Sequence, residues 1–277
     1  MDSEISVIIP VYNESSTISG CLHTLLKQSL PPKEIILIDD GSTDETLGKI
    51  KIKQKSTKKI KILTQNHQGP AIARNLGAKQ AKGKILVFVD GDMEFEPFFL
   101  ENLTEPIINK KALGTWSGNE WVKNWDNIYA KCFNYNQGRS SAQMVAPASG
   151  QRKVYRAILK SEFRKVSGFD STGYTDDWTL VEKIGQEPYI TQAKFYHSHP
   201  ENLLEVFHQA VWMGKRQYKL GMIGAFVAIL RSNIIFSLIL GIIKASYYKT
   251  PQFIMFKLVY DLGITFGAFT SLFGNKY

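Results

Sequence analysis

The sequence predicts an α/β domain built on a largely parallel sheet. Short apolar runs alternate with amphipathic helical patterns over about the first hundred residues, and polar residues crowd the end of each apolar run. Strands that alternate with helices run parallel, because each helix carries the chain back across the sheet. An apolar content of 44% and a charged content of 21% suit a globular protein with a core, which excludes disorder of the whole chain.

Two buried strands are predicted at residues 5–11 and 34–38, because ISVIIPV and EIILI are short apolar runs closed by polar residues. A helical pattern lies between them and ends at Pro31-Pro32. The polar residues that follow the two strands are Tyr12, Asn13 and Glu14 after the first, and Asp39, Asp40 and Gly41 after the second.

The next elements lead to a central strand within residues 85–95, ILVFVDGDMEF. A shorter strand is predicted at residues 60–63, and Gly69-Pro70 opens a helix that carries Arg74 near its start. The central run ends in Asp90-Gly91-Asp92, two carboxylates that flank a residue able to turn without steric cost. Carboxylates suit Mg²⁺ or Mn²⁺, although a simple Asx-type turn is the alternative.

The polar residues after these strands should meet at one edge of the sheet, where ligands of such sheets bind. Neither GxGxxG nor GxxxxGK[ST] follows any of the strands, so the fingerprints of dinucleotide binding and of a P-loop are both absent from the sequence. Carboxylates in place of a glycine-rich loop favour phosphates held through a metal ion.

These motifs together resemble the family 2 glycosyltransferases of the GT-A fold. Four blocks occur in the expected order, namely VIIPVYNE, LIDDGSTD, GPAIARNLGAKQAKG and FVDGDMEF, and the resemblance extends to roughly residue 200. It implies a GT-A α/β fold and a nucleotide diphosphate sugar, UDP- or GDP-linked, as the donor. It also implies Mn²⁺ or Mg²⁺ as cofactor and inversion at the anomeric carbon by a single displacement.

The resemblance also assigns roles to residues of the first half. Asp92 matches the direct metal ligand, and Asp90 the acid that binds ribose or metal, with Gly91 between them. For Glu14 and Arg74, an exposed charge at a helix start is the alternative. The positions that match the nucleoside and nucleotide site are Pro10, Tyr12, Glu14, Asp39 or Asp40, and Arg74.

A second acidic pair, Asp176-Asp177, follows a loop in the other half of the domain. Asp177 matches the family's general base for the acceptor hydroxyl, and Asp176 the acid beside it. The family more often has Glu-Asp here, so the shorter Asp176 leaves its partner role less secure. An acidic helix N-cap is the alternative. A base favours a hydroxyl acceptor, carried on a glycan or a lipid, because a lipid phosphate needs no deprotonation.

His197 and His199 lie where family members often complete the metal shell. Alternating side chains of an extended segment point to opposite sides, so one of the two is expected to reach the metal. His199, directly before Pro200, is slightly preferred, and packing roles for both are the alternative. Earlier in this half, Trp121, Trp125 and Tyr129 recur every four residues, which predicts a packed helix face.

The predicted organisation is a catalytic domain over residues 1–219 and a hydrophobic helical segment over residues 220–277. The first domain divides into a nucleotide-sugar half, 1–110, and an acceptor half, 111–219. The apolar runs at 222–243 and 253–273 are each about as long as a membrane span, but Arg231 and Asp261 make full insertion costly. Three arrangements of these segments are considered: a helical hairpin in the membrane, helices in the membrane interface, and core helices that close the domain or a homodimer. Attachment at the interface is favoured.

The charge and the cysteines indicate the compartment. The net charge of +9 suits an anionic membrane surface, and nucleic-acid binding is disfavoured because the basic residues cluster beside apolar helices. Cys21 and Cys132 have no CxxC spacing, which fits a reducing compartment, and no secretory signal opens the sequence. The expected location is the cytoplasmic face of the cell membrane.

The preferred function is therefore a metal-dependent inverting glycosyltransferase. A processive polysaccharide synthase is disfavoured because the QxxRW block is missing, the nearest stretch being residues 214–218. A polyprenyl-phosphate sugar synthase and a non-catalytic sugar-nucleotide-binding scaffold are the remaining alternatives.

Overall fold

The computed structural model describes residues 4–144, 153–172, 175–215, 218 and 221–272. The chain divides into two compact units. The first unit comprises Met1–Trp121, Val145–Ser171 and Asp176–His197, and the second comprises Val122–Met144, Thr172–Thr175 and Ser198–Tyr277. The predicted boundary between residues 219 and 220 lies outside the described residues. The division into a domain of 1–219 and a segment of 220–277 stays a prediction.

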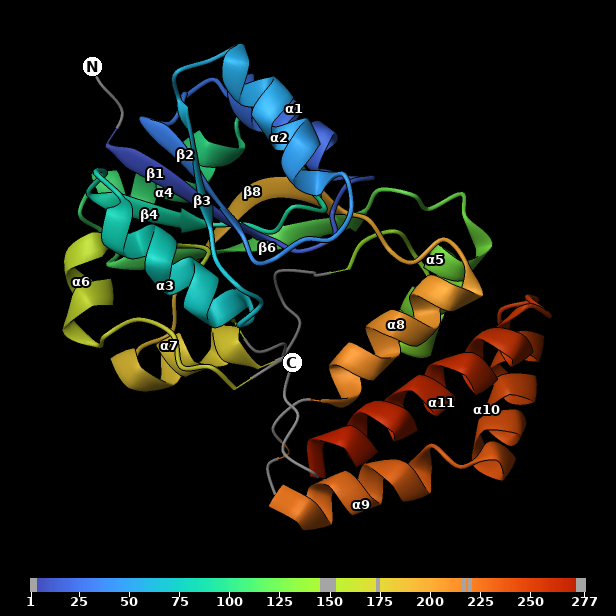
Figure 1. Cartoon of the computed structure of the whole chain (residues 1–277). Helices are drawn as coiled ribbons and strands as arrows, with labels where there is room; N and C mark the ends of the chain where they lie inside the picture. Colours follow the sequence, from blue (N-terminus) through green and yellow to red (C-terminus); the bar gives the residue numbers. More distant parts are fainter. Residues whose placement is uncertain (1–3, 145–152, 173–174, 216–217, 219–220, 273–277) are drawn as a thin grey trace. The chain divides into compact units, whose positions relative to one another are not determined.

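The first unit is an α/β sandwich around an eight-stranded sheet (Figure 1). Its strands are β1 (Ile5–Val11), β2 (Glu34–Asp39), β3 (Ile60–Thr64), β4 (Ile85–Phe88), β5 (Met93–Phe95), β6 (Gly114–Val122), β7 (Ala157–Leu159) and β8 (Tyr189–His197). Its helices are α1 (Ile18–Leu26), α2 (Thr46–Lys55), α3 (Pro70–Gln80), α4 (Phe99–Ile108), α6 (Lys160–Lys165) and α7 (Asp176–Ile184). The predicted α/β class is confirmed.

The sheet is parallel in one half and mixed in the other. Its strand order is β3-β2-β1-β4-β7-β6-β8-β5. Strands β3, β2, β1 and β4 are parallel neighbours, whereas β7 pairs antiparallel with both β4 and β6, and β5 pairs antiparallel with β8. In the parallel half Val11 is in register with Asp39, and Asp39 with Thr64, so the carboxyl ends of these strands lie level with one another.

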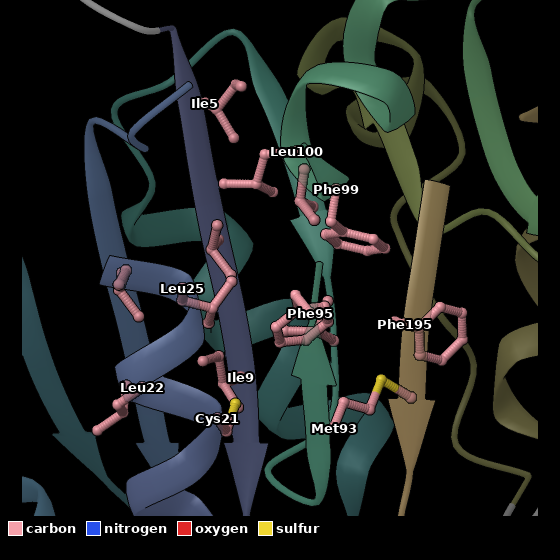
Figure 2. Packing of buried hydrophobic residues seen from close by; sticks show 14 of the residues in the cluster. Ile5, Ile9, Cys21, Leu22, Leu25, Met93, Phe95, Phe99, Leu100 and Phe195 are labelled. Carbon is pink, nitrogen blue, oxygen red and sulfur yellow. The ribbon is translucent and has the colours of Figure 1, made fainter. Parts of the chain in front are cut away.

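Alternate residues of β1 face two different cores, which explains why the strand is apolar throughout. Ile5, Val7 and Ile9 pack on one face with side chains from α1, α2 and α4. Figure 2 shows Leu22 and Leu25 of α1 in this core, together with Phe99 of α4. Ile8 belongs to the other face, where the cluster includes Ala73 of α3, Phe163 of α6 and Leu180 of α7.

The central run ILVFVDGDMEF forms two strands rather than one. β4 ends at Phe88 and β5 begins at Met93, so Asp90-Gly91-Asp92 is the turn that carries the chain from a neighbour of β1 to a neighbour of β8. A Cβ at Gly91 would lie 3.1 Å from Val11 Cγ1 and 3.3 Å from Glu14 Cγ, so the turn presses closely on the end of β1. Glycine is the residue that allows this approach.

The second unit contains the helices α5 (Ile128–Asn136), α8 (Leu203–Gly214), α9 (Gly221–Arg231), α10 (Ile234–Tyr247) and α11 (Phe253–Leu272). Its core includes Phe133 of α5, Val206 of α8, Ala245 of α10 and Phe256 of α11. The predicted helix face of Trp121, Trp125 and Tyr129 is wrong. These residues lie in β6, in a turn and in α5 respectively, because Asn127 caps α5 and starts it after the first two.

The apolar run at 222–243 is two helices, where one was predicted. Asn233 Oδ1 accepts hydrogen bonds from the backbone N–H groups of Ile235 (3.0 Å) and Phe236 (3.1 Å), so a new helix begins at residue 234. Within the described ranges, α11 is long and apolar enough to cross a membrane, and α9 with α10 qualifies only as one segment bent by 59°.

Close backbone contact joins α8 to α11. Gly263 and Gly267 of α11 lie against α8, where a Cβ on Gly263 would come within 2.7 Å of Ala210 Cβ. A Cβ on Gly267 would collide with the carbonyl oxygen of Val211 and lie 2.9 Å from Gly214 Cα.

We therefore expect Gly267→Ala to lower the free energy of unfolding by about 1–3 kcal/mol, because the clash is with backbone that cannot rotate away. Gly48→Ala in α2 is the control. A Cβ at Gly48 would meet only the flexible Glu45 carboxylate, at 3.3 Å. Alanine there should raise the free energy of unfolding by at most about 1 kcal/mol, because alanine has the higher helix propensity. Urea unfolding followed by circular dichroism measures both, and equal stability of the two variants would contradict the packing assignment.

Candidate active site

Polar side chains gather at the carboxyl edge of the parallel strands, as expected from the sequence. Asp39 ends β2, Asp40 follows it, and Tyr12 and Asp90 follow β1 and β4. Pro10 lies inside β1, buried and in register with Ile38. All of these residues belong to the first unit.

Asp40 shapes the loop that leads into α3. Its Oδ1 accepts hydrogen bonds from Gln65 Nε2 (2.6 Å) and from the backbone N–H of Gln68 (2.9 Å), and its Oδ2 accepts one from the N–H of Gly69 (2.8 Å). Gly69 has φ +90° and Pro70 is the first residue of the helix, so the loop turns sharply before α3. Asp39 Oδ1 in turn accepts from the N–H of Ser42 at 3.3 Å.

Tyr12 and His67 form an aromatic wall beside this loop. Their ring centroids are 4.0 Å apart with an interplanar angle of 27°, and Tyr12 is 43% exposed. The Nδ1 atom of His67 lies 2.9 Å from Asp40 Oδ2. A partly exposed stacked ring next to anchored carboxylates can receive a planar heterocycle.

Arg74 joins the acid after β4 to an acid of α7. Its Nη2 donates to Asp90 Oδ1 (2.7 Å) and its Nη1 to Asp177 Oδ1 (2.6 Å), although only 6% of the residue is exposed. Burial disfavours the charged guanidinium, but Asp177 and Asp90 outweigh it and raise the pKa of Arg74. Burial likewise opposes the ionised Asp90, yet Arg74 and Arg156 hold the pKa of that carboxyl well below its usual range.

Both acids of the second pair lie in the first turn of α7, where the helix dipole favours negative charge. Asp176 is buried at 2% exposure, and its carbonyl oxygen accepts a hydrogen bond from Thr179 Oγ1 at 2.7 Å. Asp177 is the more open of the two, with 34% of its side chain exposed. The cation of Arg74 therefore contacts the accessible acid of the pair.

Glu14 lies beside Asp90-Gly91-Asp92 and is held by its own turn. Its Oε2 accepts a hydrogen bond from Thr17 Oγ1 at 2.7 Å, and its backbone N–H donates to Thr46 Oγ1 at 2.7 Å. Burial, followed by the charge of Asp92, raises the pKa of Glu14 to about 8. The raised pKa keeps the Glu14 carboxyl neutral at neutral pH.

Asp92 contacts His197, the last residue of β8. The register of β5 with β8 pairs Met93 with His197, which brings His197 Nε2 to 2.8 Å from Asp92 Oδ2. The Nδ1 atom of the same ring lies 2.9 Å from Glu120 Oε1. Burial opposes the charged ring, but the two carboxylates raise the pKa of His197 well above its usual range.

His199, the histidine preferred on sequence grounds, lies in the second unit in an apolar setting. It is 6% exposed, its ring lies 4.6 Å from that of Phe133, and its Nε2 is 3.2 Å from Asn134 Oδ1. Its backbone N–H donates to Asn124 Oδ1 at 3.0 Å. These contacts are those of a packing residue, which is the alternative to metal binding for this histidine.

Sequence reasoning did not select Arg156 or Glu120 as site residues. Arg156 directly precedes β7, and the antiparallel pairing of β7 with β4 brings its Nη1 to 3.3 Å from Asp90 Oδ2. Glu120 lies in β6. Both reach the site through pairing of distant strands, for which the sequence carries no local signal.

The fold is similar to that of two proteins whose structures were solved in complex with a nucleotide sugar. One is the mannosyltransferase PcManGT from Pyrobaculum calidifontis in complex with GDP-Man and Mn²⁺, with a TM-score of 0.57 at 14% identity over 95% of this chain and 88% of that one. The other is S. aureus TarS 1–349 in complex with UDP-GlcNAc, with a TM-score of 0.55 at 16% identity over 96% and 91%. The chain therefore has the GT-A fold, as predicted.

The family is defined by the sequence. The model of glycosyl transferase family 2 matches residues 6–159, more than half of the chain, so the chain belongs to that family. The glycosyltransferase GlyA of Streptococcus pneumoniae is 32% identical over 210 residues, 69% of this chain and 28% of that protein. The uncharacterized glycosyltransferase YibD of Escherichia coli is 32% identical over 131 residues, which is 46% of this chain and 38% of that protein.

A third relative carries a more specific name. The poly(ribitol-phosphate) beta-glucosyltransferase of Bacillus spizizenii is 41% identical over 93 residues, which is 32% of this chain and 15% of that protein. The chain thus spans between 15% and 38% of the length of these three relatives.

The raised pKa of Glu14 predicts a pH-dependent stability difference from Glu14→Gln, measured on metal-free protein. Below about pH 4.5 both side chains are neutral and the two proteins should be similarly stable. Between pH 4.5 and about 8 the unfolded wild type ionises Glu14, whereas the folded protein keeps it protonated. The free energy of unfolding of the wild type should therefore fall by at least about 1 kcal/mol relative to that of the variant over this range. Urea unfolding across this pH range measures the difference, and a constant difference would exclude a raised pKa.

Proposed function

We propose that this chain transfers a sugar from a nucleotide diphosphate donor to a hydroxyl group of a glycan or lipid-linked acceptor, with inversion and with a divalent metal ion. Membership of glycosyl transferase family 2 supports sugar transfer. Structural neighbours in complex with UDP-GlcNAc, and with GDP-Man and Mn²⁺, support the donor class.

The observation that carries the proposal is the shared ion pairing of Arg74. One buried guanidinium binds both Asp177, on α7, and Asp90, in the turn after β4. The two residues that we assign as acceptor base and donor-site acid are thereby fixed at one edge of the sheet. Fixed placement of this kind is what a single in-line displacement needs, because the acceptor oxygen must approach opposite the leaving group.

Asp92 and His197 are the residues we assign to the metal. Asp92 Oδ1 is buried and makes no hydrogen bond to any described residue, although such an oxygen normally has a partner. A cation there would satisfy it, and His197 Nε2, which adjoins the other oxygen, would release its proton on binding the ion. Within the described ranges, no three His, Cys, Asp or Glu side chains form a metal site by themselves. The remaining ligands would then come from phosphate oxygens, as is usual for Mg²⁺.

We assign the described residues separate roles in the reaction. The Tyr12–His67 wall, beside the loop that Asp40 anchors, would hold the base and ribose. Asp177 Oδ1 is engaged by Arg74, so Oδ2 would accept the proton of the acceptor hydroxyl. A bound divalent ion would supply Lewis acidity to the diphosphate leaving group. Arg156, which already contacts Asp90, adds positive charge on the same side.

The two histidines give a matched test of the metal site. His197→Ala and Asp92→Ala should each weaken Mn²⁺ binding in the presence of UDP or GDP by about 10- to 100-fold or more, and lower transfer accordingly. His199→Ala should lower the melting temperature and leave Mn²⁺ affinity within about threefold, because its contacts are packing contacts. Calorimetric titration measures the affinities, and a loss caused by His199→Ala alone would reverse the assignment.

Asp177→Asn tests the base. Asparagine keeps an oxygen for Arg74 but takes up no proton, so transfer should fall by about 100- to 10,000-fold while the donor dissociation constant stays within about threefold. Asp170→Asn is the control, because that exposed carboxylate pairs with Lys183. Turnover is followed with a panel of UDP- and GDP-sugars. Unchanged transfer by Asp177→Asn, or a polyprenyl-phosphate sugar as the product, would overturn the proposed hydroxyl transfer.

A further inference from the structure

Helix α10 buries its small residues and exposes its large apolar ones. Ser237, Gly241 and Ala245 are its buried residues and recur every four positions along one face. The exposed residues include Ile234, Ile235, Phe236, Ile239, Ile242 and Ile243, which are 49–73% exposed. A surface helix of a globular protein shows the opposite pattern, with its apolar stripe towards the core.

The neighbouring helices extend this surface. Of the twenty-five large hydrophobic side chains exposed among the described residues, eighteen lie between Met222 and Phe269. Helix α9 buries only Ala225 among its described residues and exposes Met222, Ile223 and Phe226. Helix α11 adds Leu262 and Phe266, at 61% and 54%. Apolar patches of this extent mark interaction sites.

Polar contacts fix the orientation of α10, so its exposed face is not a consequence of loose packing. Ser237 Oγ donates to Asp261 Oδ2 at 2.6 Å, and Lys257 Nζ donates to Asp261 Oδ1 at 2.7 Å. A Cβ on Gly241 would lie 3.3 Å from Ile254 Cα of α11. Rotation of α10 to bury its isoleucines would remove the hydrogen bond from Ser237 to Asp261 and force large side chains against α11.

The same contacts place α11 in the core of the second unit. Eight of its residues are buried, among them Lys257 and Asp261, and its glycines lie against α8. If α11 were surrounded by lipid on all sides, as an isolated membrane-spanning helix is, its contacts with α8 and the rest of this core would be lost. Helices α9 and α10 are 11 and 14 residues long, about 16 and 21 Å at 1.5 Å per residue, which is shorter than the ~30 Å hydrocarbon core.

The charge around this surface distinguishes a lipid from a second copy of the chain. After Glu205 the sequence contains eight Lys and Arg but one acid, Asp261, which is paired internally with Lys257. Arg231, at the end of α9, and Lys249, after α10, are exposed. Two copies joined through this face would bring like charges together, whereas anionic headgroups would neutralise them.

We propose that α9, α10 and the exposed stripe of α11 rest in the surface of an anionic lipid bilayer without crossing it. The isoleucines and phenylalanines enter the boundary between headgroups and acyl chains, and Arg231 and Lys249 contact the headgroups. The break at Ser232–Asn233 lets α9 and α10 follow the surface as two short helices. This inference does not depend on the transfer activity.

Flotation of the full chain with vesicles tests the surface. Binding to vesicles of equal phosphatidylglycerol and phosphatidylcholine should exceed binding to pure phosphatidylcholine by about tenfold, and high salt should reduce the difference. The variant Ile235→Asp/Ile239→Asp should lower the partition coefficient by at least about tenfold. Ile52→Asp/Ile108→Asp is the control, because these isoleucines of the first unit are 70% and 53% exposed. Equal binding of both variants would overturn the proposal.

A fluorescent label measures how deeply position 239 enters the bilayer, and it requires only a cysteine in place of the isoleucine rather than a charged residue. Cys21 and Cys132 are buried, so a thiol-reactive environment-sensitive dye reports on Ile239→Cys, with Ile52→Cys as the control. Vesicles should shift the emission at position 239 to the blue, and lipids brominated near the headgroups should quench it most. Strongest quenching by bromine at the chain ends would indicate a spanning helix and contradict the proposal. If the dye at position 239 is shielded from water without vesicles, light scattering shows a dimer and no vesicles are bound, the face would be assigned to a second copy of the chain.

Discussion

The polar edge of the sheet depends on one buried cation. Arg74 is almost fully excluded from water, and isolated burial of its charge would cost several kcal/mol. It is stable there because Asp90 and Asp177 each accept a hydrogen bond from one of its N–H groups and place a carboxylate beside the cation. The turn after β4 and the first turn of α7, which are 87 residues apart from Asp90 to Asp177 in the chain, are therefore coupled through a single side chain. The arrangement fixes α7, and with it Asp177, relative to the strand ends.

Much of the first unit could be predicted from the sequence because its strands β1, β2 and β4 are buried on both faces. Such strands must be apolar throughout, and the polar residues after them mark where they end. The errors have local causes. Trp121, Trp125 and Tyr129 have helical spacing by coincidence, and the cap at Asn127 was the signal against it. Ser232-Asn233 is likewise a helix start inside an apolar run, and hydrophobicity alone concealed it.

The candidate site was predictable where its residues directly follow a strand, as Tyr12 and Asp40 do, or lie in the turn after one, as Asp90 and Asp92 do. It was not predictable where long-range pairing decides the neighbours. The choice between His197 and His199 depends on the register of β5 with β8, and Arg156 depends on the pairing of β7 with β4. Asp40 shows a further limit, because its oxygens already bind the loop before α3, a role that residue type alone does not reveal.

The order of elements along the chain determines when the apolar helices α9 and α10 are synthesised relative to the sheet. Residue 197 completes the sheet, and α9 begins 24 residues later, at Gly221. During synthesis at about 5–20 residues per second, the sheet can close its strand pairs seconds before the outward-facing isoleucines leave the ribosome. Unpaired strand edges and the apolar helices can then be exposed to solvent at different times. A circular permutant that places α9 and α10 ahead of β1 would lose this separation in time and would expose nascent chains to aggregation.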